Sequence, residues 1–164
     1  MSCSGLLIVW HSRTGAAQQL ARAAWHGARE AGEGVRLLAA SRARPADFMA
    51  AAGYLFVCPE NLGAMSGAMK EMFDRCYYPL LGALNGRPCA VIIAAGSDGI
   101  GAAAQVARIA TGWRLRTVAE SLIVNLGAQK PEEIMAAKQV PPASLAAAFK
   151  LGGQLAAGIG LGIY

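Results

Sequence analysis

Three short segments of the sequence carry small and polar residues in arrangements that can bind a ligand. The first is Ser12-Arg13-Thr14-Gly15, which follows an apolar run and precedes a helical segment. Hydroxyl groups, a glycine and the free N–H groups of a helix N-terminus are what holds a phosphate dianion, and the helix dipole adds to the attraction. The Walker A pattern is absent. The alternative interpretation is that Thr14 only caps the helix.

The second segment is Pro59–Gly67, which places a proline, two polar side chains and small residues between a strand and a helix. Gly63 would allow a backbone N–H group to approach the edge of a flat ring. For Ser66 we prefer helix capping, and for Met65 and Met69 a place in the core.

The third segment is Gly96–Gly101, and with Ala104 it spells G-x-G-x-x-A before a helix. This pattern raises the possibility of a Rossmann dinucleotide site, whose acidic residue would be Glu120. Glu120, however, falls inside the next expected strand, and the pattern follows the fourth strand instead of the first. We therefore interpret this segment as a glycine-lined wall for a ligand held at the first segment.

No catalytic group of side chains can be assembled from these segments. Glu60 and Asp98 are lone carboxylates on different segments, and His11 stands one position before the first segment. Segments that hold a phosphate and a planar ring, without a nucleophile, suit a cofactor that supplies its own chemistry. The pattern indicates a flavin.

Apolar runs and helical periodicity predict the elements that must position these segments. The expected strands are Gly5–Trp10, Val35–Ala40, Gly53–Cys58, Pro88–Ala95 and Thr117–Val124. The expected helices cover Ala17–Ala28, Met65–Cys76, Ile100–Thr111, Pro131–Lys138 and Ala143–Ala157, with Ser41–Asp47 as a polar connector.

Strands that alternate with helices predict an α/β fold with a doubly wound, five-stranded parallel sheet of flavodoxin-like order 2-1-3-4-5. Residues 1–164 are expected to form one such domain. Ligands bind such sheets at the carboxyl ends of the strands, where all three segments fall.

Composition excludes several classes of protein. Hydrophobic residues make up 55% of the chain and charged residues 15%, which excludes a disordered protein. The longest uncharged stretch, Leu151–Tyr164, is shorter than the roughly 20 residues of a membrane span, and no basic region precedes Gly5–Trp10 as in a signal peptide.

The charge and the cysteines of the chain indicate which kinds of ligand and which cellular location to expect. The net charge is +5, and the excess of arginine (11) over lysine (4) is unclustered, which suits small anionic ligands better than nucleic acid. Cys58 and Cys89 lie in apolar runs and are expected to be buried free thiols, and two histidines are too few for a histidine-based metal site. We expect a cytoplasmic protein without a structural metal.

Two of the segments resemble motifs of a known superfamily. Trp10–Gly15 resembles the phosphate loop of flavodoxin-like FMN proteins. Cys58–Gly67, followed by Lys70 and Phe73-Asp74-Arg75, resembles a segment of NADPH-dependent FMN reductases and of the tryptophan-repressor-binding-protein-like NAD(P)H:quinone oxidoreductases. Gly86-Arg87-Pro88 and the third segment are similar to further stretches of that family.

The resemblance implies an FMN-dependent oxidoreductase that takes hydride from NAD(P)H and passes it through flavin N5 to a quinone or similar small acceptor. It also implies which residues bind FMN around the phosphate, along the ring and at its pyrimidine side. These are Ser12, Arg13, Thr14, Gly15 and Ala16, then Pro59, Glu60, Asn61, Leu62, Gly63 and Ala64, and finally Gly96, Ser97, Asp98 and Gly99.

The chain also departs from the family pattern. Ala17 stands where a second hydroxyl is common, Leu62 replaces an aromatic residue that often stacks on the flavin, and the insertions of the quinone reductases are missing. The alternatives are a flavodoxin-type electron carrier, whose usual acidity disagrees with the charge of +5, and a fold relative that has lost its flavin.

Self-association is a further expectation. The nearly all-apolar helix Ile100–Thr111, Trp25 on a polar helix side and the tail Leu151–Tyr164 offer more apolar surface than a monomer usually exposes. We expect a homo-oligomer, either a dimer or a tetramer, unless the tail simply packs as the last helix.

Overall fold

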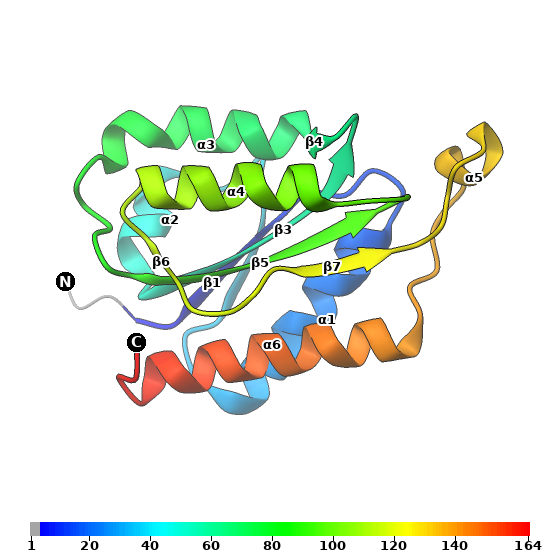
Figure 1. Cartoon of the computed structure of the whole chain (residues 1–164). Helices are drawn as coiled ribbons and strands as arrows, with labels where there is room; N and C mark the ends of the chain where they lie inside the picture. Colours follow the sequence, from blue (N-terminus) through cyan, green and yellow to red (C-terminus); the bar gives the residue numbers. More distant parts are fainter. Residues whose placement is uncertain (1–3) are drawn as a thin grey trace.

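The computed structural model describes residues 4–164 as a seven-stranded sheet with helices on both faces (Figure 1). The strands are β1 (Leu6–Trp10), β2 (Arg36–Ala39), β3 (Gly53–Asn61), β4 (Ala64–Met65), β5 (Pro88–Ala95), β6 (Arg116–Thr117) and β7 (Leu122–Asn125). All pairs are parallel except that of β3 with β4. The predicted α/β class, the parallel sheet and the positions of the first four expected strands are confirmed.

The predicted strand count and order need correction. The order is β2-β1-β3-β5-β6, with β4 paired to β3 and β7 paired to β5, in place of five strands in the order 2-1-3-4-5. The expected last strand, Thr117–Val124, is interrupted. Along β5 the register advances from Cys89 to Ile92, whereas its partner advances from Thr117 to Leu122 and therefore carries two extra residues. Strands β6 and β7 lie at the edge of the sheet and pair only with β5. The two extra residues therefore interrupt only one ladder of hydrogen bonds.

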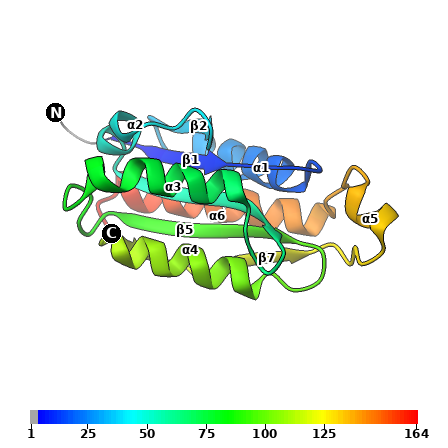
Figure 2. The same cartoon turned by 90° about the horizontal axis from the view of Figure 1, so that it is seen from above.

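Six helices complete the fold. They are α1 (Ala16–Ala31), α2 (Pro45–Ala50), α3 (Gly67–Leu80), α4 (Ile100–Gly112), α5 (Pro131–Met135) and α6 (Pro142–Gly160). Helices α3 and α4 cover one face of the sheet and α1 and α6 the other, as the view from above also shows (Figure 2). Successive side chains along a strand point to opposite faces of the sheet. Tyr54 and Phe56 of β3 therefore pack in one core, and Leu55 and Val57 pack in the other.

Three helix predictions need correction. The polar connector Ser41–Asp47 contains the start of α2, which the buried Phe48 attaches to the core. Met65 is buried as expected but lies in β4 instead of the following helix. The short helix α5 ends at Met135, because the Lys138 ammonium group binds carbonyl oxygens at its C-terminal end.

The predicted buried thiols are confirmed for Cys58 and Cys89, and Cys76 is a third free, buried cysteine. Cys3 lies outside the described residues. Between residues 4 and 164, no helix combines the length and apolarity that crossing a membrane requires.

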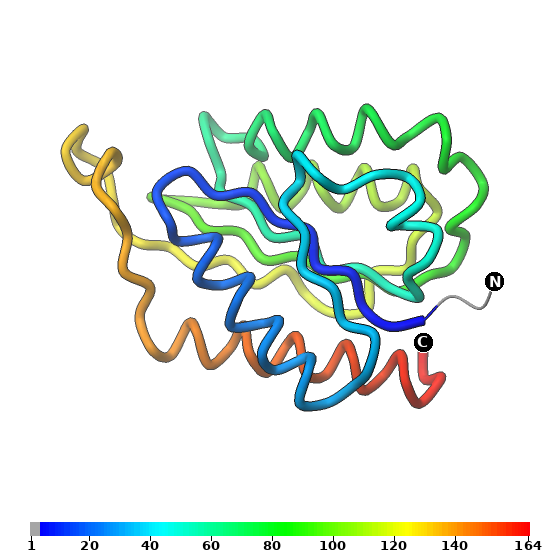
Figure 3. The backbone as a smooth tube through the Cα atoms, turned by 180° about the vertical axis from the view of Figure 1, so that it is seen from behind, coloured from blue at the N-terminus to red at the C-terminus, as the bar shows by residue number. Residues whose placement is uncertain are grey.

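The apolar tail packs as the last helix, α6, along α1 (Figure 3). Leu155 and Ala156 are buried there, and Trp25 is half-buried with the Arg29 guanidinium 4.7 Å from its ring centroid. Two of the three features behind the expected homo-oligomer are thus largely used within the chain. Leu161 and Ile163 stay exposed, and self-association remains a prediction.

Helices α1 and α6 approach each other through glycine. A Cβ atom at Gly152 would lie 2.0 Å from the Ala24 carbonyl oxygen, and one at Gly27 would lie 2.0 Å from that of Phe149. Backbone atoms cannot yield to a methyl group, so the close contact of the two helices requires glycine at both positions.

We predict that Gly152→Ala lowers the free energy of unfolding by about 1 to 3 kcal/mol or more, because overpacking forces the helices apart. The matched control is Gly160→Ala in the same helix, where nothing lies within 4 Å of the added Cβ atom. Urea unfolding of the two variants checks the prediction. Equal stability of the two would show that the close approach is not a constraint.

Candidate functional site

The three predicted segments meet at the carboxyl ends of the strands, where they line a cleft of about 870 Å³. Of the predicted binding residues, the following line it: Ser12, Arg13, Thr14, Ala16, Pro59, Glu60, Asn61, Leu62, Gly63, Gly96 and Ser97. Gly15, Ala64, Asp98 and Gly99 lie in the same segments but do not line the cleft. The volume is within the range of clefts that hold a cofactor-sized ligand, roughly 300 to 1,000 Å³.

The first segment leaves the N-terminus of α1 open. The N-cap residue is Gly15, with φ of 96°, and no side chain caps the helix. Ser12 Oγ accepts a hydrogen bond from the Gly15 N–H group at 3.1 Å, whereas no hydrogen bond of the Thr14 side chain is found among residues 4–164. The interpretation of Thr14 as a helix cap is therefore wrong. First-turn amides have no acceptor within a helix, and no acidic residue stands in this turn.

The second segment is a β-hairpin. Strand β3 continues to Asn61, which pairs with Ala64 of β4. The two residues between them, Leu62 and Gly63, both have positive φ angles, of 52° and 70°. This is the pattern of a type I′ turn, which suits a two-residue hairpin. The side chain of Leu62 is fully exposed at the tip, although it lines the cleft.

Behind the hairpin, two polar side chains join the first and second segments. Ser66 is fully buried at the N-cap of α3, but its hydroxyl lies 2.9 Å from His11 Nδ1 and does not cap the helix. The expected capping role of the Ser66 hydroxyl is therefore wrong. Burial, and secondarily the charge of Arg13, lowers the pKa of His11.

Cys58 lies beside this pair but is not a nucleophile. Burial raises the pKa of its thiol to about 12, so the thiolate is scarcely populated at neutral pH. In the part of the chain that the structure describes, no group of three or more His, Cys, Asp and Glu residues could hold a metal ion.

Glu60 joins the second segment to the third. Its carboxylate accepts hydrogen bonds from the N–H groups of Gly99 at 2.9 Å and Ala102 at 3.0 Å, at the N-terminus of α4. The hairpin backbone packs closely there, because a Cβ atom at Gly101 would lie 2.0 Å from the Gly63 carbonyl oxygen. Both Glu60 oxygens are thus engaged with the helix, and Glu60 fixes the hairpin on α4 in addition to lining the cleft.

The sequence did not predict the fourth side of the cleft. It consists of Leu126, Ala128, Ile134, Met135 and Lys138, which lie between β7 and α6. The sequence contained one indication of this wall, which is that the stretch follows the carboxyl end of the last strand, where ligands bind such sheets. Its side chains carry no pattern that indicates binding.

Comparison with known protein families gives a match to the middle of the chain. Residues 42–129 match the sequence profile of NADPH-dependent FMN reductases, which covers the second and third segments but not the first. No curated protein sequence matches the chain.

Solved structures share the fold. A WrbA-like flavodoxin from Agrobacterium tumefaciens superimposes with a TM-score of 0.77 at 17% identity, covering 98% of this chain and 99% of its own. A flavodoxin from Streptococcus pneumoniae gives 0.73 at 18% identity, covering 93% and 97%. A flavodiiron protein from Giardia intestinalis gives 0.75 at 16% identity, covering 97% of this chain but 37% of its own.

We predict that Glu60→Ala lowers the free energy of unfolding by about 1 to 3 kcal/mol, because the Gly99 and Ala102 amides lose their acceptor. The control is Glu120→Ala, an exposed residue whose side chain makes no hydrogen bond within residues 4–164, and it should stay within about 0.5 kcal/mol of wild type. Urea unfolding measures both. Similar losses in the two variants would contradict the role of Glu60.

The lowered pKa of His11 predicts that acid weakens the fold. The unfolded chain binds a proton at its ordinary pKa of about 6.5, and the folded chain only at lower pH. Between these values the unfolded state holds more protons, so the free energy of unfolding falls as the pH falls. The effect is moderate because His11 is only half-buried.

Urea unfolding between about pH 7.5 and pH 5.5 measures this dependence. We expect His11→Asn to reduce the fall in stability. An unaltered fall in His11→Asn would contradict the assignment.

Proposed function

The chain belongs to the NADPH-dependent FMN reductase family, and from that premise we propose that it binds FMN in the cleft and acts as an NAD(P)H-dependent oxidoreductase on a quinone or similar small acceptor. The observation that carries the proposal is that the three segments with flavin-type motifs meet around one cleft. The proposed FMN-binding residues are those named from the sequence, at the first, second and third segments.

The phosphate end of the cleft has the groups that an FMN phosphate needs. The open N-terminus of α1 offers backbone N–H donors and the positive end of the helix dipole. Arg13, which lines the cleft, is exposed beside it and adds a cationic side chain. No acidic residue in the first turn opposes a dianion.

The ring end suits a flat cofactor. Gly63 and Gly96 expose backbone on two walls, and the Glu60 hydrogen bonds hold these walls at a fixed separation. Such preorganisation reduces the cost of ordering the site when a ligand binds. The residues in these walls therefore orient a ring without having to move.

When bound, FMN supplies the redox chemistry by accepting a hydride from NAD(P)H and passing two electrons to an acceptor. The chain's own contribution is binding and orientation. Neither Cys58 nor His11 lines the cleft, and His11 bonds with Ser66 behind the hairpin.

A flavodoxin-type electron carrier is the second candidate, favoured by the structural similarity to flavodoxins. The charge of +5 opposes it, because such carriers usually present an acidic surface to basic partners. Potentiometric titration of the FMN-loaded protein separates the two. Two well-separated one-electron steps without NAD(P)H oxidation would favour the carrier.

The binding half of the proposal is tested by titrating the protein with FMN and with riboflavin, which lacks the phosphate, and following flavin fluorescence. We expect Arg13→Glu to weaken FMN binding about tenfold, or about 1.4 kcal/mol, by placing a carboxylate beside the phosphate. Riboflavin binding should change little. Arg22→Glu, exposed on α1 and away from the cleft, is the charge-matched control. Equal effects on FMN and riboflavin would contradict the phosphate assignment.

The catalytic half is tested by NADPH and NADH oxidation with FMN-loaded protein and a quinone. We expect turnover well above that of the same concentration of free FMN, because the cleft orients donor and acceptor on the ring. Turnover no faster than free FMN, with FMN bound, would contradict an enzymatic function and leave the carrier.

A further inference from the structure

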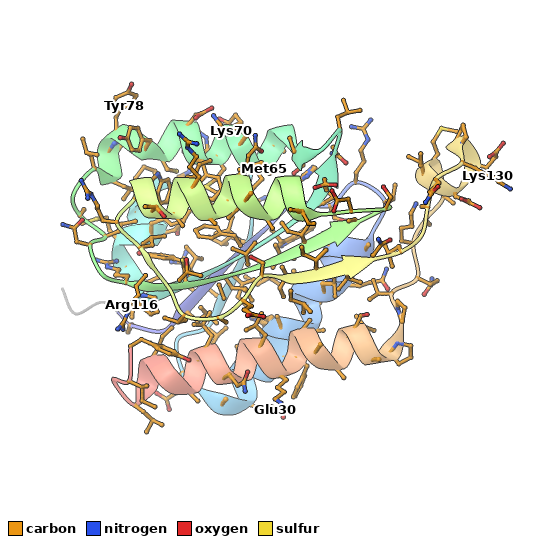
Figure 4. All side chains as sticks on the ribbon, viewed as in Figure 1. Glu30, Met65, Lys70, Tyr78, Arg116 and Lys130 are labelled. Atoms are coloured by element: carbon orange, nitrogen blue, oxygen red, sulfur yellow. The ribbon has the colours of Figure 1, made fainter. Side chains whose placement is uncertain are left out.

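Residues 126–138, which we term the return segment, form the fourth wall of the cleft. They connect β7 to α6 and include the short helix α5, which projects beyond the ends of the strands (Figures 1 and 4). Lys130, labelled in Figure 4, lies on this projection. The family match ends at residue 129, so most of the return segment lies outside it.

The start of the return segment is attached to the third segment of the cleft. The Asn125 side-chain amide donates to the Ser97 carbonyl oxygen, and the Leu126 N–H group donates to that of Ala95 at 2.9 Å. The backbones are in contact, since a Cβ atom at Gly96 would lie 2.7 Å from the Ala128 carbonyl oxygen.

The end of the return segment is attached to the first segment. The Lys138 N–H group donates to the Thr14 carbonyl oxygen at 2.8 Å. The Gln19 side chain then joins α1 to this stretch, donating to the carbonyl oxygens of Lys138 at 2.7 Å and Gly15 at 3.1 Å and accepting from the Val140 N–H group at 3.2 Å. The return segment is therefore held at both ends and closes a ring of walls around the cleft.

Between these attachments the segment is held by local hydrogen bonds and not by the core. The Glu133 carboxylate accepts from the N–H groups of Gln129 and Lys130, both at 3.1 Å. The Lys138 ammonium group donates to the carbonyl oxygens of Glu133, Ile134 and Ala136. Residues 129–137 are all exposed. Residues 129–137 thus form a projecting part of the wall that belongs to neither core.

This wall presents two large apolar side chains to the cleft. Ile134 and Met135 are 53% and 74% exposed and line the cleft, as does Leu62 at the hairpin tip, which is 105% exposed. Exposed apolar side chains that gather around a cleft indicate a ligand that covers them. The phosphate end of the same cleft is cationic, so the apolar side chains suit a different ligand part or a second ligand.

We propose that Ile134 and Met135, together with Leu62, bind the electron acceptor and select flat, apolar molecules of the size of a bicyclic quinone over small hydrophilic acceptors. Gln19 acts as a positioning residue for the wall. The inference rests on the proposed function. In the net reaction NAD(P)H and one proton reduce the quinone to the hydroquinone, which gains two electrons and two protons, and NAD(P)⁺ is released.

The test compares two double variants of the FMN-loaded protein with matched chemistry. Ile134→Ser/Met135→Ser removes the apolar pair from the cleft. Leu161→Ser/Ile163→Ser removes a similarly exposed apolar pair at the C-terminus, outside the cleft. For each we measure kcat/KM with a naphthoquinone and with ferricyanide. We expect the naphthoquinone-to-ferricyanide ratio to fall about tenfold in the first variant and to stay at the wild-type value in the second.

The outcomes separate this inference from the proposed function. Failure of the wild-type protein to bind FMN, or to turn over any acceptor, would overturn the proposed function. An active wild type with an unchanged ratio in Ile134→Ser/Met135→Ser would overturn the acceptor assignment alone. A rise in the Kd for FMN in this variant, with the ratio unchanged, would assign the wall to the cofactor instead.

Gln19→Ala tests the positioning role, with Gln18→Ala as control because the Gln18 side chain makes no hydrogen bond in the described part of the chain. At saturating FMN, we expect faster hydrogen exchange at residues 126–140 and a higher KM for the naphthoquinone in Gln19→Ala only. The KM should rise by about tenfold or less, because the segment keeps its other attachments. Faster exchange without a change in KM would overturn the role of Gln19.

Discussion

The burial of the central strands on both faces is the constraint on which the rest of this structure depends. Side chains along β1, β3 and β5 pack into one of two cores, so these strands have almost no position for a polar residue. Polar and conformationally flexible residues are therefore confined to the strand ends. At the carboxyl ends they meet the N-termini of α1 and α4, whose amides and dipoles attract anions. The location of the cleft follows from this confinement.

The walls of the cleft are joined by polar side chains that are easily mistaken for ligand-binding groups. Glu60 attaches the hairpin to α4. Asn125 attaches the return segment to the third segment, and Gln19 attaches the return segment to the first segment. Each side chain satisfies backbone groups that would otherwise be free at the end of an element. The four walls are thus joined by hydrogen bonds within the chain, which favours a preorganised site for a cofactor that supplies the chemistry.

The sequence predicted what depends on local pattern. Pro88–Ala95 has the predicted strand bounds, and the helical periodicity located α1, α3, α4 and α6 within a few residues. The sequence did not predict features that depend on contacts between residues far apart in the chain. The hairpin appeared as a loop because its turn includes Leu62 at a positive φ angle, which apolar residues rarely adopt. The contacts that attach Glu60 and the return segment to the other walls join residues 28 or more positions apart, such as Asn125 with Ser97, Glu60 with Gly99 and Gln19 with Lys138.

Our central claim is that the first, second and third segments form a single FMN site with the phosphate at the N-terminus of α1. Amide-resolved NMR of the protein during titration with FMN tests it most directly. We predict that the largest shifts fall on residues 12–17, on the hairpin residues 59–64 and on residues 96–99. Shifts concentrated at the opposite end of the sheet, or none in residues 12–17 despite saturation, would contradict it.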